Sequence, residues 1–429
     1  MSWSALASTW GSVGSTWRSI LWAPVPENTS DLQVELGLQK AFLLDDEIAG
    51  VIGNTEYVLD GEDFIDITPF AYNISTSRGK NTELDKYKAG SLNVELHNQS
   101  RFFDPNFIDS PFYGNIVPRR GVRVLYNSVP VFTGKVSDWN LSYRPGDDAV
   151  AQLIGVDQFS QLATQQLTPG TVVEQTTGQR VAAVLNMASV DWPVNDRRID
   201  TGQSTLGSAV VDSENALTYL QNIELSEIGG SLFISREGYL AFKDRLAIPT
   251  AESKVLFADD GTGVPFIVNE VEYGTENLFN DITVTSPAGT ATASDPVSQE
   301  SYGVLPQSYD TYLSSLEQLT AAANFILNRY SQPQLRFKNI SVDVSNLTDA
   351  QRDTLLELEL ADIAEIKITP NGVGDPVDTF ALIIGIDHVI TPNTHEIRFS
   401  FAPIQENIFI IGDPEFGIIG ADAPGVLGY

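Results

Sequence analysis

The chain has 429 residues and carries 56 Asp and Glu against 25 Lys and Arg, a formal net charge of −31. This length predicts about two to four domains, and so acidic a chain is not expected to grip nucleic acid, because that requires Lys and Arg against phosphates. The absence of cysteine excludes disulfides, thiol nucleophiles and zinc–cysteine sites. No apolar run reaches the ~18 residues of a membrane span and no secretory leader is recognised, so we expect a protein that stays in the cell that makes it unless it leaves inside a larger particle.

Residues 1–30 differ from the rest because they hold four of the six tryptophans: Trp3, Trp10, Trp17 and Trp22. Three of these are seven residues apart, which is a heptad spacing, although it lasts less than three heptads. We interpret the segment as an aromatic arm that docks on a partner subunit. An arm packed on its own chain is the alternative, and a membrane-surface helix is disfavoured because only Arg18 could supply a basic face.

Residues 31–168 are expected to be mostly β. Segments such as SLNVELHN and AVAQLIGVD alternate apolar and polar residues with a period of two, and short polar turns separate them. Many short strands with short turns predict a sandwich or barrel. A short helix over 158–167 is expected to close this first β-barrel domain.

Residues 169–260 are expected to form a small α+β domain. Its second helix begins near Ser213 as a possible N-cap and stops at Gly229 and Gly230, and a hairpin over SLFISREGYLAFKDR follows.

The pattern returns to β over 261–405, which we predict to be a second β-barrel domain with a helical insertion. One face of the inserted helix is expected to carry Leu313, Leu316, Ala323, Ile326 and Leu327, and a later helix has a capping box of Thr348 with Gln351. The Gly- and Pro-rich residues 406–429 are expected to be an extended C-terminal arm.

No motif for catalysis stands out. With 56 carboxylates, no pair can be singled out as an acid–base couple, and there is no GxSxG or P-loop. His388 and His395 lie near the ends of a predicted hairpin, where a metal site with Asp387 or Glu396 is conceivable, but ordinary strand residues are the better interpretation. We therefore expect no enzyme activity, no cofactor and no metal.

The segment RGKNTELDKYKAG, residues 78–90, gathers Arg78, Lys80, Lys86 and Lys88 in this acidic chain. Because Glu83 and Asp85 lie among them, a phosphate site is disfavoured, and we interpret the segment as a mixed-charge turn that feeds a barrel strand and faces a neighbouring subunit.

The wider stretch STSRGKNTELDKYKAGSLNVELHNQSRFFDPNF resembles the N-terminal segment of minor tail proteins from long-tailed bacteriophages, especially phages of actinobacteria. The resemblance rests on an ordered set of residues: Arg78, Gly79, Glu83, Leu84, Asp85, Ala89, Gly90, Asn98, Phe103, Asp104 and Pro105. It covers about residues 31–260 well and 261–405 more loosely, and residues 1–30 and 406–429 depart from it.

The resemblance implies a mainly β protein with α+β parts and a tail-hub architecture, in which two tube-like β-barrels flank a small α+β domain. It implies a structural hub of a phage tail tip, a baseplate-hub-like part of the virion assembled in the host cytoplasm. It also implies a homotrimer that joins the tail tube and distal tail ring to tip or fibre proteins and surrounds the channel for tape-measure protein and DNA.

Two other functions remain open at this point: a hexameric distal-tail ring protein and a receptor- or glycan-binding tip protein. A cell-wall hydrolase has no support in the sequence. If acidic side chains line the channel, DNA would pass without binding, because like charges repel. Residues 341–429 alone hold fifteen Asp and Glu and three Lys and Arg.

Overall fold

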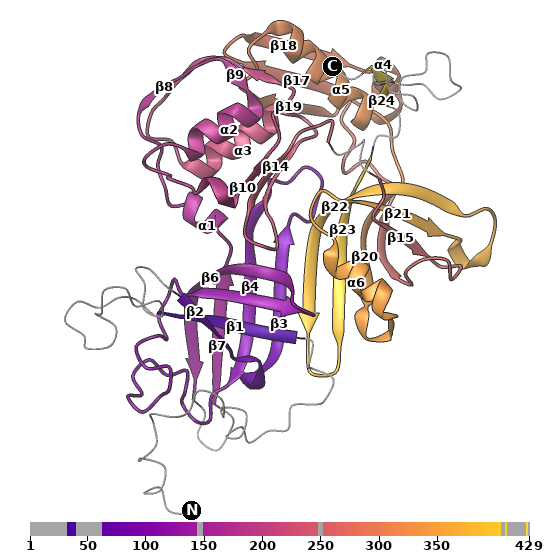
Figure 1. The fold of residues 1–429 in the computed structure, drawn as a ribbon. Coiled ribbons are helices and arrows are strands. Elements are labelled where there is room, and N and C mark those ends of the chain that lie inside the picture. Colours follow the sequence, from indigo (N-terminus) through magenta and orange to yellow (C-terminus); the bar gives the residue numbers. More distant parts are fainter. Residues whose placement is uncertain are drawn as a thin grey trace, which may run out of the picture.

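A computed structural model describes residues 32–39, 62–143, 149–247 and 252–404, together with the short strands at 408–409 and 426–427. The described chain is mainly β. Two β units lie side by side, and two units that mix helices and strands lie across one end of them (Figure 1). The tryptophan arm and most of the C-terminal arm fall outside the described residues.

The first β unit contains seven strands in the order β2-β1-β5-β6-β7-β4-β3. Alternation of apolar and polar residues explains them: in β4, Leu92, Val94 and Leu96 are buried while their neighbours are not. The strands are β1 (Leu32–Gln39), β2 (Glu62–Asp66), β3 (Ala71–Gly79), β4 (Lys88–His97), β5 (Gly121–Tyr126), β6 (Val129–Ser142) and β7 (Val150–Val156), with a 3-10 turn at Thr68–Phe70.

The first αβ unit follows directly. Its elements are α1 (Phe159–Leu162), β8 (Gly170–Val172), β9 (Gln175–Thr176), α2 (Thr177–Leu185), a 3-10 turn (Val194–Asp196), β10 (Arg197–Ile199), β11 (Thr205–Leu206), β12 (Ala209–Val211), α3 (Ala216–Ser226), β13 (Ser231–Ile234) and β14 (Leu240–Lys243). The predicted N-cap Ser213 is wrong: Asn215 caps α3 by accepting a hydrogen bond from the Thr218 N–H at 3.0 Å. Helix α1 is also shorter than the predicted 158–167.

The second β unit is built from strands on both sides of an insertion. They are β15 (Val255–Ala258), β16 (Ile267–Glu272), β20 (Arg336–Asp343), β21 (Ile363–Ile368), β22 (Val377–Ile390) and β23 (His395–Pro403), with 3-10 turns at Val344–Asn346 and Pro370–Gly372. Helix α6 (Asp349–Glu357) has the predicted capping box between Thr348 and Gln351.

The insertion is a second αβ unit with a hydrophobic core of its own. It comprises β17 (Asp281–Ser286), β18 (Gly289–Ser294), α4 (Pro296–Tyr302), β19 (Pro306–Asp310) and α5 (Leu316–Tyr330). Ala323, Ile326 and Leu327 lie on the buried face of α5 as predicted. Leu316 does not, since it is 55% exposed, and Leu313 is buried but precedes the helix, which Ser315 caps.

The two β units share one sheet. Thirteen strands are connected, and no strand order among the described residues closes on itself, so the two closed barrels expected from the sequence are not found there. One contiguous hydrophobic core runs through both β units and the first αβ unit. The described part of the C-terminal arm is a parallel pair, β24 (Ile408–Phe409) and β25 (Val426–Leu427).

Candidate assembly site at the junction of the units

Strand β22 joins the two β units by pairing antiparallel with β3 of the first unit. The register runs from Gly385 opposite Gly79 to Ile390 opposite Ile74. The other edge of β22 pairs with β23. Continuous backbone hydrogen bonding therefore crosses from one β unit to the other.

Gly79 ends β3 at the closest approach of the two units. It has φ of 95°, and a Cβ at this position would lie under 3.0 Å from the Ile384 carbonyl oxygen. The next N–H, from Lys80, donates to that same oxygen at 2.8 Å. Only glycine allows both the positive φ and this approach.

Arg78 ties the junction to the first αβ unit through Glu359. The Arg78 side chain is 3% exposed, and its Nη1 lies 2.6 Å from Glu359 Oε1. The second carboxylate oxygen of Glu359 accepts the Arg236 backbone N–H at 2.7 Å, in the turn between β13 and β14. The Glu359 carboxylate of the second β unit thus binds both the first β unit, through Arg78, and the first αβ unit, through Arg236. A buried charge requires such partners.

Residues 80–87 form a connector between β3 and β4, and Glu83 within it reaches the second αβ unit. Glu83 Oε1 accepts hydrogen bonds from Arg329 Nε at 2.8 Å and from the Tyr330 hydroxyl at 2.7 Å, both at the end of α5. Arg336 of β20 lies 3.9 Å from the other Glu83 oxygen. Burial, together with the Glu83 charge, raises the pKa of Tyr330 well above its usual value.

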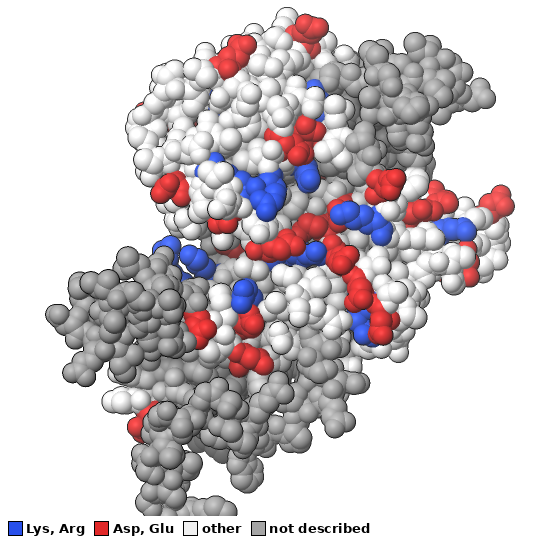
Figure 2. Space-filling view, in the orientation of Figure 1, with Lys and Arg blue, Asp and Glu red and all other residues white. Residues whose placement is uncertain are grey.

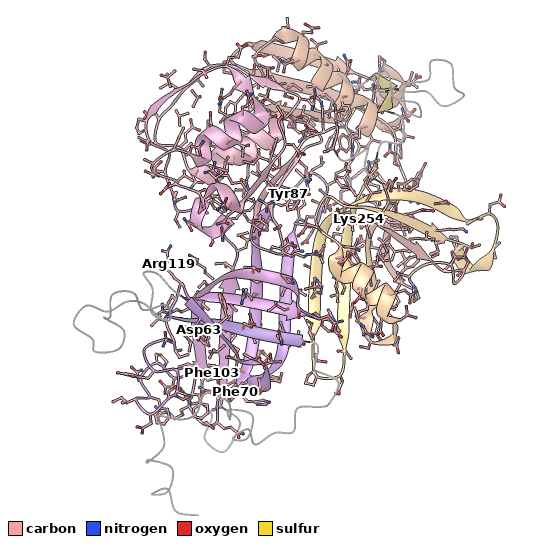
Figure 3. The ribbon with its side chains drawn as sticks, viewed as in Figure 1. Asp63, Phe70, Tyr87, Phe103, Arg119 and Lys254 are labelled. Atoms are coloured by element: carbon pink, nitrogen blue, oxygen red, sulfur yellow. The ribbon has the colours of Figure 1, made fainter. Side chains whose placement is uncertain are left out.

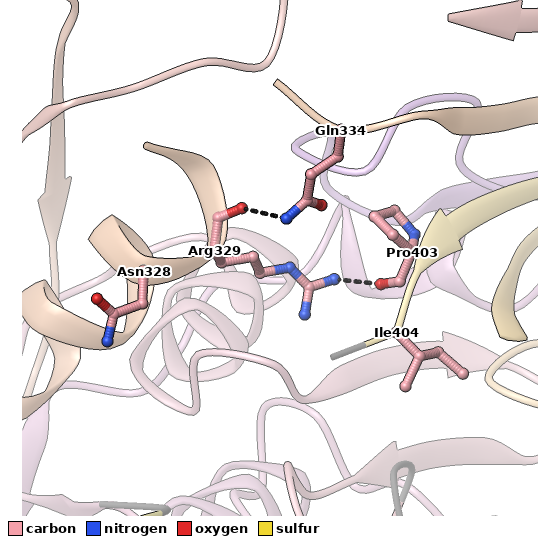
Figure 4. Close-up of a pocket in the computed structure, with 5 residues that line it drawn as sticks. All are labelled: Asn328, Arg329, Gln334, Pro403 and Ile404. Carbon is pink, nitrogen blue, oxygen red and sulfur yellow. Dashed lines mark hydrogen bonds between the residues drawn. The ribbon is translucent and has the colours of Figure 1, made fainter. Parts of the chain in front are cut away.

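Arg329 completes this contact by binding the end of β23. Its Nη2 donates to the Pro403 carbonyl at 2.7 Å, and Gln334 donates to the Arg329 carbonyl at 3.4 Å (Figure 4). These residues line a small pocket with Asn328 and Ile404. Arg329 therefore links the connector, α5 and the last strand of the second β unit.

The rest of the connector packs on both αβ units. Leu84 packs against the core of the second αβ unit. Tyr87, labelled in Figure 3, lies where the first β unit meets the αβ units and is fully buried. Its ring lies 5.8 Å from Phe233, and its carbonyl accepts a hydrogen bond from Gln221 at 2.8 Å. Lys86 Nζ donates to Asn222 Oδ1 at 3.1 Å.

The mixed-charge turn of residues 78–90 was expected to face a neighbouring subunit, but several of its charged side chains contact other units of the same chain. Of its basic residues, Arg78, Lys80 and Lys86 contact their own chain, with Lys80 Nζ 4.7 Å from the centre of the Tyr87 ring. Glu83 is mostly buried. Acidic and basic side chains gather in a band along the boundary between the β units and the αβ units (Figure 2).

Ala89 and Gly90 lie in the first residues of β4, and Gly90 contacts a buried carboxylate. Asp157 Oδ2 accepts the Gly90 N–H at 2.6 Å, and Oδ1 accepts the Phe159 N–H at 2.9 Å at the start of α1. A Cβ on Gly90 would lie 2.8 Å from Asp157 Oδ2. Burial raises the pKa of Asp157 to about 7, against the opposing effect of these two hydrogen bonds.

The other residues of the tail-protein pattern lie elsewhere, in the loop between β4 and β5. Asn98 Oδ1 accepts the Phe103 N–H at 3.0 Å, and Asp104 accepts the Arg101 guanidinium at 2.6 Å. Pro105 is exposed beside them. The residues of the tail-protein pattern therefore lie in two places, the junction and this loop. Asp85 is exposed on the connector. The four arm tryptophans lie outside the described residues, so their docking role stays a prediction.

His388 of β22 and His395 of β23 are strand residues, and their side chains contact each other across the two paired strands. His388 Nδ1 lies 3.0 Å from His395 Nε2, and the two residues are 4% and 5% exposed. Burial lowers the pKa of His388 well below its usual value and lowers that of His395 to about 4. Asp387 pairs across strands with Arg398, and no group of three metal-binding side chains is found within the described ranges.

Sequence reasoning missed Glu359, Arg329 and Arg336. They lie roughly 250 to 280 residues from the connector and stand in segments with no distinctive motif. Within the part of the chain that the structure describes, no helix is long and apolar enough to cross a membrane.

No protein-family model matches the chain, and no curated protein matches its sequence. Solved structures do match its fold. One is the 43 kDa tail protein of prophage MuSo2 from Shewanella oneidensis, 14% identical, with a TM-score of 0.53 over 87% of this chain and 96% of that chain. Another is the tail protein from Neisseria meningitidis MC58, 13% identical, with a TM-score of 0.56 over the same shares. The chain therefore has the fold of these tail proteins.

Proposed function

We propose that this chain is a structural hub of a bacteriophage tail tip. The observation that carries the proposal is the pairing of β22 with β3, which joins two neighbouring β units in one continuous sheet. The similarity to two tail proteins over 87% of this chain supports it. Among the described residues, the junction is built from strand pairing, ion pairs and hydrogen bonds between units of the chain. We propose that the protein is not an enzyme and uses no cofactor or metal.

The finer assembly is part of the same proposal. Three chains form a ring in which each contributes two barrel-like β units, so that six such units surround the channel and match a sixfold ring above. In the tail tip of the virion, assembled in the host cytoplasm, the ring contacts the distal tail ring, the tape-measure protein and other minor tail or fibre proteins. DNA passes through the channel without specific binding.

Native mass spectrometry of the purified chain tests the oligomer. A trimer of 46.8 kDa chains is expected. A hexamer would favour the distal-tail ring instead, and a monomer at micromolar concentration would contradict a self-assembling hub.

Labelling in the particle tests the location. An antibody against the chain, or a tag on it, should mark the tip of the tail in electron micrographs. A label along fibres would favour a receptor-binding protein, and a label on the capsid would overturn the proposal. Clearing of peptidoglycan in a zymogram by this chain would overturn the non-enzymatic part.

A further inference from the structure

The first αβ unit contacts the first β unit along a seam, with β4 and the connector on one side and α1 and α3 on the other. The chain passes from one unit to the other at Asp157, which stands between β7 and α1. The Asp157 N–H donates to the Gly90 carbonyl of β4 at 3.0 Å, and the Asp157 carbonyl accepts the Ser160 N–H of α1 at 3.2 Å. Asp157 is therefore the residue about which the two units would hinge.

The Asp157 side chain bonds to both sides of the seam. One carboxylate oxygen accepts the Gly90 N–H of β4, and the other accepts the Phe159 N–H of α1. Asp157 is 4% exposed. The charged side chain that faces it is Arg78, and Arg78 is bound to Glu359 at 2.6 Å. An ionised Asp157 is thus a buried charge with no cation bonded to it among the described residues, which is a costly state.

A second buried carboxylate, Glu224 of α3, lies at the same seam. It is 9% exposed and accepts the Leu232 N–H. The titratable groups that face it are on the connector: Lys80, Lys86 and Tyr87. Burial lowers the pKa of Lys80, so this lysine is a weakened counterion. Both carboxylates that the first αβ unit buries against β4 and the connector therefore lie where their charged forms are poorly compensated.

Both carboxylates titrate near neutral pH for this reason. Burial raises the pKa of Asp157 to about 7 and that of Glu224 to about 7, although Arg78 opposes the first shift and the two lysines oppose the second. A solvated carboxyl has a pKa of about 4. Because the pKa is higher when the seam is closed, closure is most stable at acid pH, and that stability is lost as the pH rises from about 4 through 7.

We propose that Asp157 and Glu224 form a proton-controlled latch on the first αβ unit. Their protonated forms hold the unit closely on β4 and the connector, and their ionisation loosens the seam. The bond from the Arg236 N–H to Glu359 involves neither carboxylate, so the unit remains attached when the latch opens. The latch does not depend on the proposed hub function, because all of its groups belong to one chain.

Hydrogen exchange of the full chain at pH 6 and pH 8, corrected for the pH dependence of an unprotected amide, measures the latch. For one carboxyl whose pKa falls from about 7 to about 4 when it is exposed, linkage gives about a tenfold increase in local opening over this interval. We therefore expect the protection of the α1 and α3 amides to fall at least about tenfold in the wild type. The amides of α5, in the second αβ unit, are the internal reference and should keep their protection.

Three variants assign the effect to the two carboxylates. Asp157→Asn combined with Glu224→Gln should abolish the loss of protection between pH 6 and pH 8. Glu224→Gln alone should reduce it, and this variant keeps the test decisive if Asp157→Asn disturbs folding through its two backbone hydrogen bonds. Asp353→Asn is the matched control, since Asp353 is exposed on α6, and it should behave as the wild type.

Three results would overturn the proposal. Protection of α1 and α3 that is constant or rises between pH 6 and pH 8 in the wild type would exclude the latch. A Glu224→Gln variant that loses as much protection as the wild type, together with a double variant that does the same, would assign the pH dependence to other groups. An equal loss in α5 would show a global effect of pH rather than a loosened seam.

Discussion

Replacing Glu83 by alanine should detach the second αβ unit from the connector. Glu83 Oε1 accepts two hydrogen bonds from Arg329, at 2.8 and 2.5 Å, and one from the Tyr330 hydroxyl at 2.7 Å. The Glu83 side chain is 9% exposed and that of Arg329 is 18% exposed. The substitution therefore leaves a mostly buried guanidinium without its carboxylate.

The expected loss in the free energy of unfolding is about 3 kcal/mol. Breaking a buried ion pair from one side costs roughly 3 to 5 kcal/mol, because the remaining charge stays desolvated. We choose the lower end because Arg329 keeps the Pro403 carbonyl as a partner and is partly exposed. Glu276→Ala is the matched control: it removes a carboxylate that lies 3.1 Å from Lys338 Nζ. The Glu276 side chain is 64% exposed, so we expect no measurable loss in the free energy of unfolding.

Two measurements compare the Glu83→Ala and Glu276→Ala variants: urea unfolding gives the free energy of unfolding, and hydrogen exchange gives the local stability of the α5 amides. Because the second αβ unit has its own core, Glu83→Ala should speed exchange in α5 more than exchange in β4. The Glu83→Ala and Arg329→Met double-mutant cycle should show a coupling of about 2 kcal/mol. If Glu83→Ala and Glu276→Ala differ by less than about 1 kcal/mol, the connector does not hold the unit as described.

Two further predictions concern the β3–β22 junction. Gly79→Ala should lower the free energy of unfolding in urea by at least about 3 kcal/mol, because the added Cβ would meet the Ile384 carbonyl. Gly114→Ala is the control: Gly114 has a φ of 78° but open space around it, so this variant should lose only about 1 kcal/mol. Equal losses in the two variants would mean that backbone strain alone matters. The buried pair His388 and His395 has folded pKa values below the unfolded value of about 6.5, so its stabilising effect is complete above that pH and is lost as the pH falls towards 4. Comparing wild type with His395→Gln between pH 7 and 4 should show the wild type losing about 3 kcal/mol more, and parallel pH curves would contradict this assignment.

The sequence predicted strands and capped helices well where local patterns decide them. The period-two alternation of β4 and the capping box of Thr348 with Gln351 act within a few residues, so one segment contains all the information. The N-cap of α3 was misplaced because Ser213 and Asn215 are both good caps, and the choice depends on Asn215 also donating to the Ala163 carbonyl at 2.7 Å, in another element.

The junction could not be predicted in the same way. Its partners are set by which strand edges meet, and the pairing of β3 with β22 joins residues about 310 apart in the chain. Nothing in SRGKNTELD indicates that Glu83 would meet Arg329 or that Arg78 would meet Glu359. Gly79 and Gly90 were better indicators of the chain path at the junction. Gly79 has a positive φ, and Gly90 leaves no room for a Cβ beside Asp157.

The four basic residues in 78–90, Arg78, Lys80, Lys86 and Lys88, differ in what their charges do. Arg78 neutralises Glu359 inside the molecule at 2.6 Å, where salt screens little, whereas Lys86 and Lys88 are exposed and their charges are more strongly screened. A salt-sensitive subunit contact could therefore involve only the exposed lysines. Lys86 bonds to Asn222 within the chain, so Lys88 is the better residue to reverse. Lys88→Glu should leave unfolding in urea almost unchanged, so any loss of oligomer in that variant would report on a contact between chains and not on the junction within one chain.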